Sequence, residues 1–190
     1  MKYFKKLVGE RIYLSPVVAT EEEAEKFTEW LNDFNITDYI LRSNLNTTLE
    51  DERNYLTNSA KNPCNRNFFI IDSENDKLIG TIGLKDFNWV PRSAVLGVFI
   101  GEKDYLSKGY GTEAINLILD FGFNYLNLHS IRLDLISENE RAHKSYIKCG
   151  FKDTGITRED VFINGKYYDT LHMDILENEF NGSYIKNKNI

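Results

Sequence analysis

Residues 103–114 read KDYLSKGYGTEA, and this stretch places Gly109 and Gly111 at the start of a segment that otherwise has the composition of a good helix. A glycine inside a helix costs about 1 kcal/mol relative to alanine, so two glycines in the opening turn indicate that the backbone has another use there. The first N–H groups of a helix have no intrahelical acceptor and carry a partial positive charge. A strand, this turn and a helix in succession therefore predict a site for a phosphate group.

The predicted phosphate site consists of the main-chain amides from Ser107 to Thr112, the Thr112 hydroxyl and the ammonium group of Lys108. It differs from the nucleotide P-loop, in which the lysine follows the glycines, and from the dinucleotide fingerprint, which needs a third glycine where this chain has Ala114. A glycine pair alone is about as consistent with a plain turn that binds nothing as it is with a phosphate site. The neighbouring segments therefore have to decide between these two interpretations.

The residues before the loop predict one strand and two helices. Residues 11–18 alternate apolar and polar side chains, which is typical of a strand. Each of the following helices is predicted to open with a capping box. The two boxes are Thr20 with Glu23 and Thr47 with Glu50, and Pro63 is expected to close the second helix.

Three β-rich runs follow, at residues 66–73, 77–87 and 92–101. The short turn signals between them predict an antiparallel meander. After the glycine loop, residues 112–128 predict an apolar helix, and residues 130–136 predict a strand that is covered on both faces. The helical crossover makes the third meander strand parallel to this next strand and places the glycine turn at the end where open α/β sheets bind ligands.

Residues 139–149 predict a short helix, and residues 160–180 predict a hairpin with an Asn164-Gly165 turn. The fold class is therefore α/β, with a mixed sheet of about seven strands and helices on both faces. We expect a single domain over residues 1–180 and a frayed tail over residues 181–190.

The composition is that of a globular chain, with 190 residues of which 42% are hydrophobic and 27% charged. The formal net charge of -6 argues against a nucleic-acid partner. No run approaches the roughly 20 apolar residues of a membrane span, and residues 1–14 contain no apolar run typical of a signal peptide, so we expect no membrane partner. Two isolated cysteines, and three histidines without metal-ligand spacing, predict neither a disulfide framework nor a metal site and favour a cytoplasmic location.

Two motifs together, YLSKGYGTEA at residues 105–114 and SENERAHKSYIKCGF at residues 137–151, resemble those of the GNAT superfamily of N-acetyltransferases. Nearly the whole chain is similar to this family, and most of all to the branch of ribosomal-protein alanine acetyltransferases and their small-molecule relatives. The resemblance implies a sheet that splays between the fourth and fifth predicted strands. It also implies acetyl-CoA as the co-substrate, with no metal.

The resemblance implies that the loop Leu106–Gly111 holds the pyrophosphate of acetyl-CoA through main-chain amides. Leu106 departs from the family's Gln/Arg, and Ser107 stands where glycine is common. The amides near Val98 and Phe99 are expected to pair with the pantetheine arm. The cofactor-binding residues predicted in this way are Val98, Phe99, Leu106, Ser107, Lys108, Gly109, Tyr110, Gly111, Thr112, Asn139 and Tyr146.

By the same resemblance, Asn139 binds the pantetheine arm and Tyr146 faces the cofactor sulfur as the general acid, because a phenol with a pKa of about 10 is able to protonate a leaving thiolate. The alternatives are that Asn139 only caps its helix and that Tyr146 is only a core aromatic. Asp134 is the predicted general base, with a structural pair to Arg132 as an equal alternative. Many relatives carry a glutamate where this chain has Val95, which leaves the identity of the base open.

The acceptor pocket is expected between residues 34–44 and the last hairpin, with Asp38, Tyr39, Tyr168 and His172 as candidate lining residues. The predicted function is an N-acetyltransferase in which a primary amine attacks acetyl-CoA directly. An acyl-CoA sensor without turnover, and a structural protein whose loop is empty, are the alternatives. The acceptor is either a small-molecule amine or a protein N-terminal amine, and relatives suggest a possible homodimer.

Overall fold

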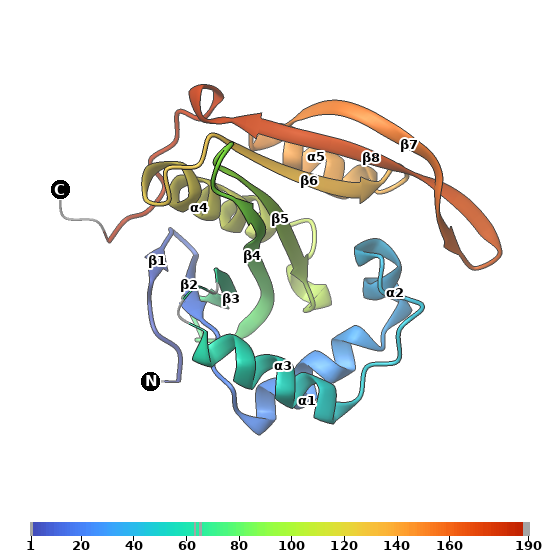
Figure 1. The fold of residues 1–190 in the computed structure, drawn as a ribbon. Coiled ribbons are helices and arrows are strands. Elements are labelled where there is room, and N and C mark those ends of the chain that lie inside the picture. Colours follow the sequence, from blue (N-terminus) through green and yellow to red (C-terminus); the bar gives the residue numbers. More distant parts are fainter. Residues whose placement is uncertain (1, 63, 65, 188–190) are drawn as a thin grey trace.

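The computed structural model describes residues 2–62, 64 and 66–187, and its centre is one mixed sheet (Figure 1). Within these residues the sheet has eight strands in the order β1-β2-β3-β4-β5-β6-β8-β7. The strands are β1 (Leu7–Val8), β2 (Ile12–Pro16), β3 (Asn67–Asp72), β4 (Leu78–Asn88), β5 (Ser93–Ile100), β6 (Ser130–Ile136), β7 (Lys152–Ile163) and β8 (Lys166–Leu176). The extra strand relative to the expected seven is the two-residue β1. The predicted mixed α/β fold is confirmed.

The helices lie on both faces of the sheet, as predicted. They are α1 (Glu21–Leu31), α2 (Phe34–Thr37), α3 (Leu49–Lys61), α4 (Tyr110–Asn124) and α5 (Glu140–Lys148), with 3-10 turns η1 (Asp38–Ile40), η2 (Lys103–Tyr105) and η3 (Glu177–Glu179). In Figure 1, α1 and α3 lie on one side of the β2–β5 region, and α4 and α5 lie on the other.

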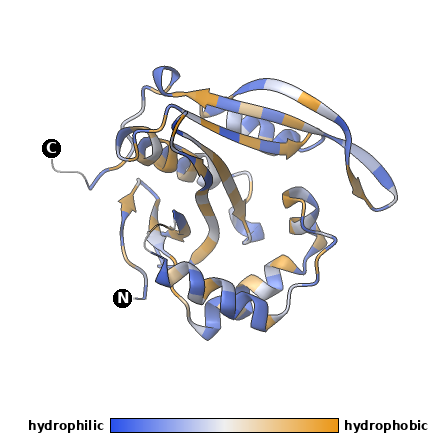
Figure 2. Cartoon of the chain, in the orientation of Figure 1, coloured by the Kyte–Doolittle hydropathy of each residue, from blue (hydrophilic) through white to orange (hydrophobic). Residues whose placement is uncertain are grey.

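Two hydrophobic clusters hold these layers together, because successive side chains of a strand point to opposite faces. Leu14 and Ile70 belong to the cluster that contains α4, whereas their neighbours Tyr13 and Phe69 pack against α1. The same alternation is visible along β6 and β8 in Figure 2. Among the described residues, no helix combines the length and apolarity that crossing a membrane requires.

The helix starts differ in detail from the predicted capping boxes. Thr20 is the N-cap of α1, but its hydroxyl donates to the buried Glu23 carboxylate and caps no backbone amide. The box of α3 is formed by Thr48 and Asp51, one residue later than predicted. Thr47 is instead tied to Asn32, whose side-chain amide donates to the Thr47 carbonyl (2.8 Å). Pro63 lies outside the described residues.

The crossover between β5 and β6 is confirmed as parallel, and these strands pair at three positions only: Ser93 with Ser130, Ala94 with Ile131 and Val95 with Arg132. Beyond Val95, β5 continues to Ile100 without pairing to β6. The predicted splay is therefore present. The expectation that β6 is covered on both faces is wrong, because Arg132 and Asp134 are exposed on one of its faces.

The hairpin β7–β8 turns at Asn164 and Gly165, which both have positive φ (47° and 79°), as an Asn-Gly turn of type I′ requires. Strand β7 begins at Lys152, eight residues before the predicted hairpin. Figure 1 shows the hairpin extending past the rest of the sheet.

The C-terminal segment is docked up to Asn187, so the expected frayed tail is wrong for residues 181–187; residues 188–190 are outside the described part. The carboxylate of Asp120, fully buried in α4, accepts hydrogen bonds from the amides of Tyr184 (2.6 Å) and Ile185 (3.0 Å). The Lys186 amide donates to the Val8 carbonyl (2.7 Å). A buried carboxylate that needs donors explains why this polar segment packs on the domain.

Replacing Asp120 with alanine should therefore release this segment. Because each hydrogen bond to a charged group contributes about 1.5–3 kcal/mol, we expect an Asp120→Ala variant to lose about 2–4 kcal/mol of unfolding free energy in urea. Limited proteolysis should cleave the variant first near Tyr184. A Glu140→Ala variant, altered at an exposed helix position, serves as the control. Unchanged stability and proteolysis of the Asp120 variant would refute this role.

Candidate functional site

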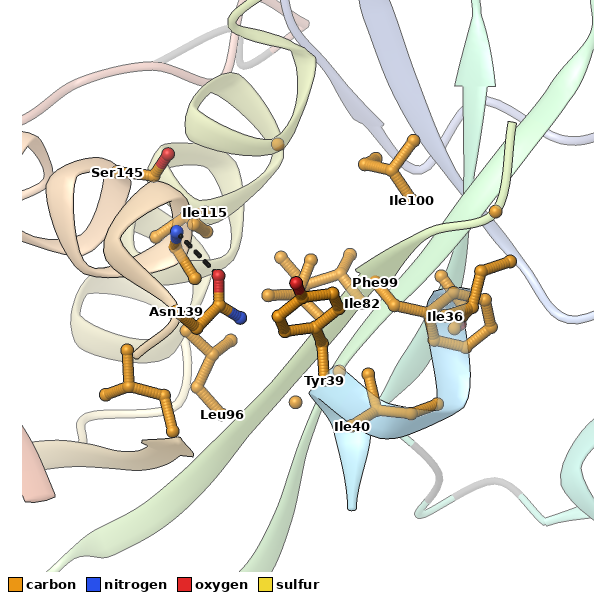
Figure 3. Close-up of a pocket in the computed structure, with 18 of the residues that line it drawn as sticks. Ile36, Tyr39, Ile40, Ile82, Leu96, Phe99, Ile100, Ile115, Asn139 and Ser145 are labelled. Carbon is orange, nitrogen blue, oxygen red and sulfur yellow. Dashed lines mark hydrogen bonds between the residues drawn. The ribbon is translucent and has the colours of Figure 1, made fainter. Parts of the chain in front are cut away.

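A cleft of about 840 Å³ passes through the gap between β5 and β6. One arm is lined by the glycine loop, α4 and α5, and the other by α1, α2, η1 and α3. Figure 3 shows Asn139, Ser145 and Ile115 on the first side and Ile36, Tyr39 and Ile40 on the second, with Ile82, Leu96 and Phe99 of the sheet between them. One continuous cavity thus reaches both faces of the sheet.

The glycine loop leads directly into α4, which begins at Tyr110, two residues earlier than the sequence predicts. Gly109 is the N-cap of α4 with φ 88°, a left-handed value that costs glycine little. Ser107 also has positive φ, at 59°. The Arg11 side chain braces the loop by donating to the Lys108 carbonyl (3.0 Å), and a Cβ at Gly109 would stand 3.1 Å from the same guanidinium. The loop is thereby fixed before any ligand arrives.

Gly111 has different surroundings from Gly109. A Cβ there would approach only Ile100, at 3.9 Å, so the fold itself tolerates a side chain. Gly111 lines the cleft, and the N–H groups of the first helical turn point out of the helix end without intrahelical acceptors. The missing side chain therefore leaves room for an anion to reach these donors.

Most of the predicted cofactor-binding residues meet at this cleft. Its lining includes Val98, Phe99, Leu106, Ser107, Gly109, Gly111, Thr112, Asn139 and Tyr146. Lys108 and Tyr110 are not among the lining residues. The Tyr110 ring lies under the Arg11 guanidinium, 4.6 Å from its centroid, and against the Tyr105 ring.

The free edge of β5 offers main-chain groups to the gap. Gly101 donates its N–H to the Ile79 carbonyl of the β4 side (3.0 Å). Because main-chain groups alternate between the two edges of a strand, the Phe99 amide also faces β4, whereas the Val98 and Ile100 amides face the gap. The alternation thus favours the Val98 amide as a hydrogen-bond donor to a ligand in the gap. Phe99 contributes its side chain to the lining and packs against α1.

Tyr146 on α5 is buried, with 9% of its surface exposed, and lies on the cleft. Its position on the apolar face of an amphipathic helix explains this burial. The centroids of the Tyr146 and Phe151 rings are 5.8 Å apart, in an edge-on arrangement. Burial, with a smaller effect of nearby Cys149, raises the pKa of Tyr146 to about 12. The phenol is therefore protonated at neutral pH and able to donate a proton.

Asn139 caps its helix and also lines the cleft. It is the N-cap of α5, where its side-chain oxygen accepts a hydrogen bond from the Ala142 amide (3.2 Å). In Figure 3 its amide nitrogen points away from this bond and into the cleft. Capping fixes the carboxamide orientation and leaves the N–H donors for a ligand.

Asp134 lines the cleft but pairs with His172, not with Arg132. The distance between Asp134 Oδ1 and His172 Nδ1 is 2.7 Å, and His172 Nε2 lies 2.8 Å from the Thr157 hydroxyl. The register of the sheet causes this contact, because Asp134 and His172 are directly opposed across β6 and β8. The side chain is about half exposed, contrary to the burial expected for this strand.

Among the four residues suggested for the acceptor pocket, Tyr39 lines the cleft, whereas Asp38, Tyr168 and His172 do not. The sequence prediction missed Glu52, which lines the cleft and is 3% exposed. A signal was available: Leu49, Glu52 and Leu56 share one face of α3 at helical spacing, so a carboxylate occupies a position on the apolar face.

The family model described as "Acetyltransferase (GNAT) domain" matches residues 11–152. The spermidine N(1)-acetyltransferase of Vibrio cholerae is 37% identical over 112 residues, which are 59% of this chain and 64% of that protein. The probable N-acetyltransferase YjcK of Bacillus subtilis is 31% identical over 90% of this chain and 96% of its own length. A crystal structure of spermidine N-acetyltransferase from Vibrio cholerae with CoA and spermine superposes with a TM-score of 0.79, at 28% identity, covering 89% of this chain and 97% of that one.

The aligned region thus spans slightly less than two thirds of the spermidine acetyltransferase matched by sequence, whereas the structural match covers nearly all of the solved chain. The resemblance on which the sequence analysis drew is confirmed at the level of the superfamily.

The two loop glycines should respond differently to alanine. We expect Gly111→Ala to keep the melting temperature of the wild-type protein but to weaken CoA binding by at least about tenfold, or 1.4 kcal/mol, because only the ligand needs the space. Gly109→Ala should in addition lower stability by about 1 kcal/mol, because φ is positive there. Calorimetric titration with CoA and thermal denaturation measure the two effects. Equal CoA affinity of Gly111→Ala and the wild type would contradict the assignment.

Proposed function

The chain belongs to the GNAT acetyltransferase family, and from this premise we propose that it transfers an acetyl group from acetyl-CoA to a primary amine by direct attack, with both substrates bound at once. The observation that carries the proposal is the single cleft through the β5–β6 gap. It joins an anion-binding helix end to a second arm on the other face of the sheet. A donor and an acceptor are able to approach each other there from opposite sides.

The residues of the first arm fit acetyl-CoA. The first-turn amides of α4 and the Thr112 hydroxyl hold the pyrophosphate, and the vacant side-chain position of Gly111 admits it. The Val98 amide on the free edge of β5 and the Asn139 carboxamide hold the pantetheine arm. When bound, acetyl-CoA supplies the activated acetyl group as a thioester. The Leu106 side chain has no hydrogen-bonding group, so it contributes only van der Waals contacts to this arm of the cleft.

Tyr146 acts as the general acid in this proposal. Transfer to an amine expels a thiolate, and a phenol that burial keeps protonated is suited to give it a proton. Cys149 is not a nucleophile, because burial raises its pKa to about 12 and keeps it as a thiol. The absence of a suitable nucleophile at this position favours direct attack over an acetylated enzyme.

Asp134 is the proposed proton acceptor for the amine. Its Oδ1 is held by His172 at 2.7 Å, which fixes the carboxylate while Oδ2 remains for the amine or for a bridging water. Val95 cannot serve as a base, so β5 contributes only shape to this part of the cleft. The relatives named for spermidine favour a small amine over a protein N-terminus as the acceptor.

Removing the Tyr146 hydroxyl tests the reaction. A Tyr146→Phe variant should lose about 10²-fold or more in kcat, the usual size of general-acid catalysis, while its CoA affinity stays near wild type. Thiol release from acetyl-CoA with spermidine measures the rate, and calorimetry measures CoA affinity. Tyr167→Phe, at an exposed hairpin position, is the matched control. Failure of the wild type to release thiol with any amine, despite binding CoA, would favour the acyl-CoA sensor.

The pH dependence follows from the same group. Activity should rise with pH as the acceptor amine loses its proton. We expect no decline in activity at any pH up to about 10, because Tyr146 has a pKa of about 12 and stays protonated over this range. A profile of kcat/KM between pH 6 and 10 checks this. A decline between pH 8 and 10 that disappears in the Tyr146→Phe variant would show that the phenol titrates far lower than its burial implies.

A further inference from the structure

Glu52 is an unusual feature of the second arm of the cleft. It lies on α3, is 3% exposed and lines the cleft. Within the described residues its Oε2 atom has no hydrogen-bond partner. Buried carboxylates are normally paired or hydrogen-bonded, so an unpaired oxygen on a cavity wall points to a group that the cavity receives.

The charges around Glu52 do not satisfy it. Burial is the main influence and raises the pKa of Glu52; Arg42 opposes this rise by its charge, and the neighbouring Asp51 adds to it. Arg42 is exposed and donates no hydrogen bond to Glu52 within the described residues. Lys85, Lys103 and Arg141 also line the cleft and are exposed, so water screens the charges of all four cations. A buried carboxylate attracts a cation that enters the cleft more strongly than these exposed cations repel it.

The path to Glu52 is apolar. Phe27, Leu31, Ile36 and Ile40 line the same arm, and Tyr39 faces the cleft beside them (Figure 3). The other carboxylate of the lining, among the described residues, is Asp134, which is exposed and already paired with His172. Glu52 belongs to α3 and Tyr146 to α5, and these two helices lie on opposite sides of the sheet in Figure 1. Apolar side chains therefore line much of the cleft between the proposed reaction centre and Glu52.

We propose that Glu52 is a binding site for a second, protonated nitrogen of the acceptor, and that the acceptors are therefore aliphatic diamines or polyamines. The inference rests on the proposed acetyltransferase function. An ammonium group supplies donors and a positive charge to Oε2, and the methylene chain fits the apolar side chains between the two ends. A monoamine with the same chain leaves Glu52 unpaired and binds more weakly.

The kinetic test compares 1,4-diaminobutane with butylamine, which differ only by the second nitrogen. In a Glu52→Gln variant, the ratio of kcat/KM for the diamine to that for the monoamine should fall at least about tenfold, mainly through KM of the diamine. Glu50→Gln, on the exposed side of the same helix, should keep the wild-type ratio. An unchanged ratio in Glu52→Gln, or an equal loss for both amines, would overturn the proposal.

A binding test separates this inference from the proposed reaction, because it needs no turnover. Spermidine should raise the melting temperature of the wild type and of Glu50→Gln, but not that of Glu52→Gln. Without ligand, Glu52→Gln should melt above the wild type at pH 8, since it removes a buried unpaired charge. A lower melting temperature of ligand-free Glu52→Gln would make Glu52 a structural residue and refute the proposal. If spermidine binds through Glu52 and no acetyl group is transferred, the proposed reaction fails while the binding site stands.

Discussion

The incomplete pairing of β5 with β6 is the constraint on which the site depends. Three pairs join the strands at their N-terminal ends, and β5 then continues alone. The unpaired edge leaves main-chain groups that a compact sheet would have satisfied internally, and polar groups of this kind need another partner. The same separation opens the path between the two faces of the sheet. The proposed cofactor arm, reaction centre and acceptor arm all depend on this one local loss of pairing.

The glycine loop owes its shape to contacts from the other end of the chain. Glu113 in the first turn of α4 accepts hydrogen bonds from the amides of Glu10 (2.8 Å) and Arg11 (2.9 Å) through one oxygen, and its other oxygen pairs with the Arg11 side chain. Arg11 in turn holds the Lys108 carbonyl. Ser107, which directly precedes the braced Lys108, has a positive φ that glycine would adopt without strain.

The cleft also contains two carboxylates in opposite environments. Asp134 is exposed and held by a histidine, which suits a group that takes up a proton and passes it to water. Glu52 is buried beside apolar side chains, and one of its oxygens lacks a hydrogen-bond partner among the described residues. These surroundings suit a carboxylate that binds a cation. The environment of each carboxylate, and not its residue type, separates a proposed base from a proposed anchor.

Local patterns of sequence were sufficient for the element order, the strand over residues 130–136, the Asn164-Gly165 turn and the parallel crossover, because periodicity, turn residues and the handedness of connections act over short stretches of chain. Two motifs together also located the loop and Tyr146. Tertiary structure decided the rest. The partner of Asp134 depends on the register of β6 against β8, and the capping box of α3 moves because Thr47 is tied to Asn32. The segment after residue 180 docks because Asp120 is buried beneath it. Glu52 joins the cleft only when α3 packs against α1. Contacts between residues distant in the chain are set by packing, which no local pattern encodes.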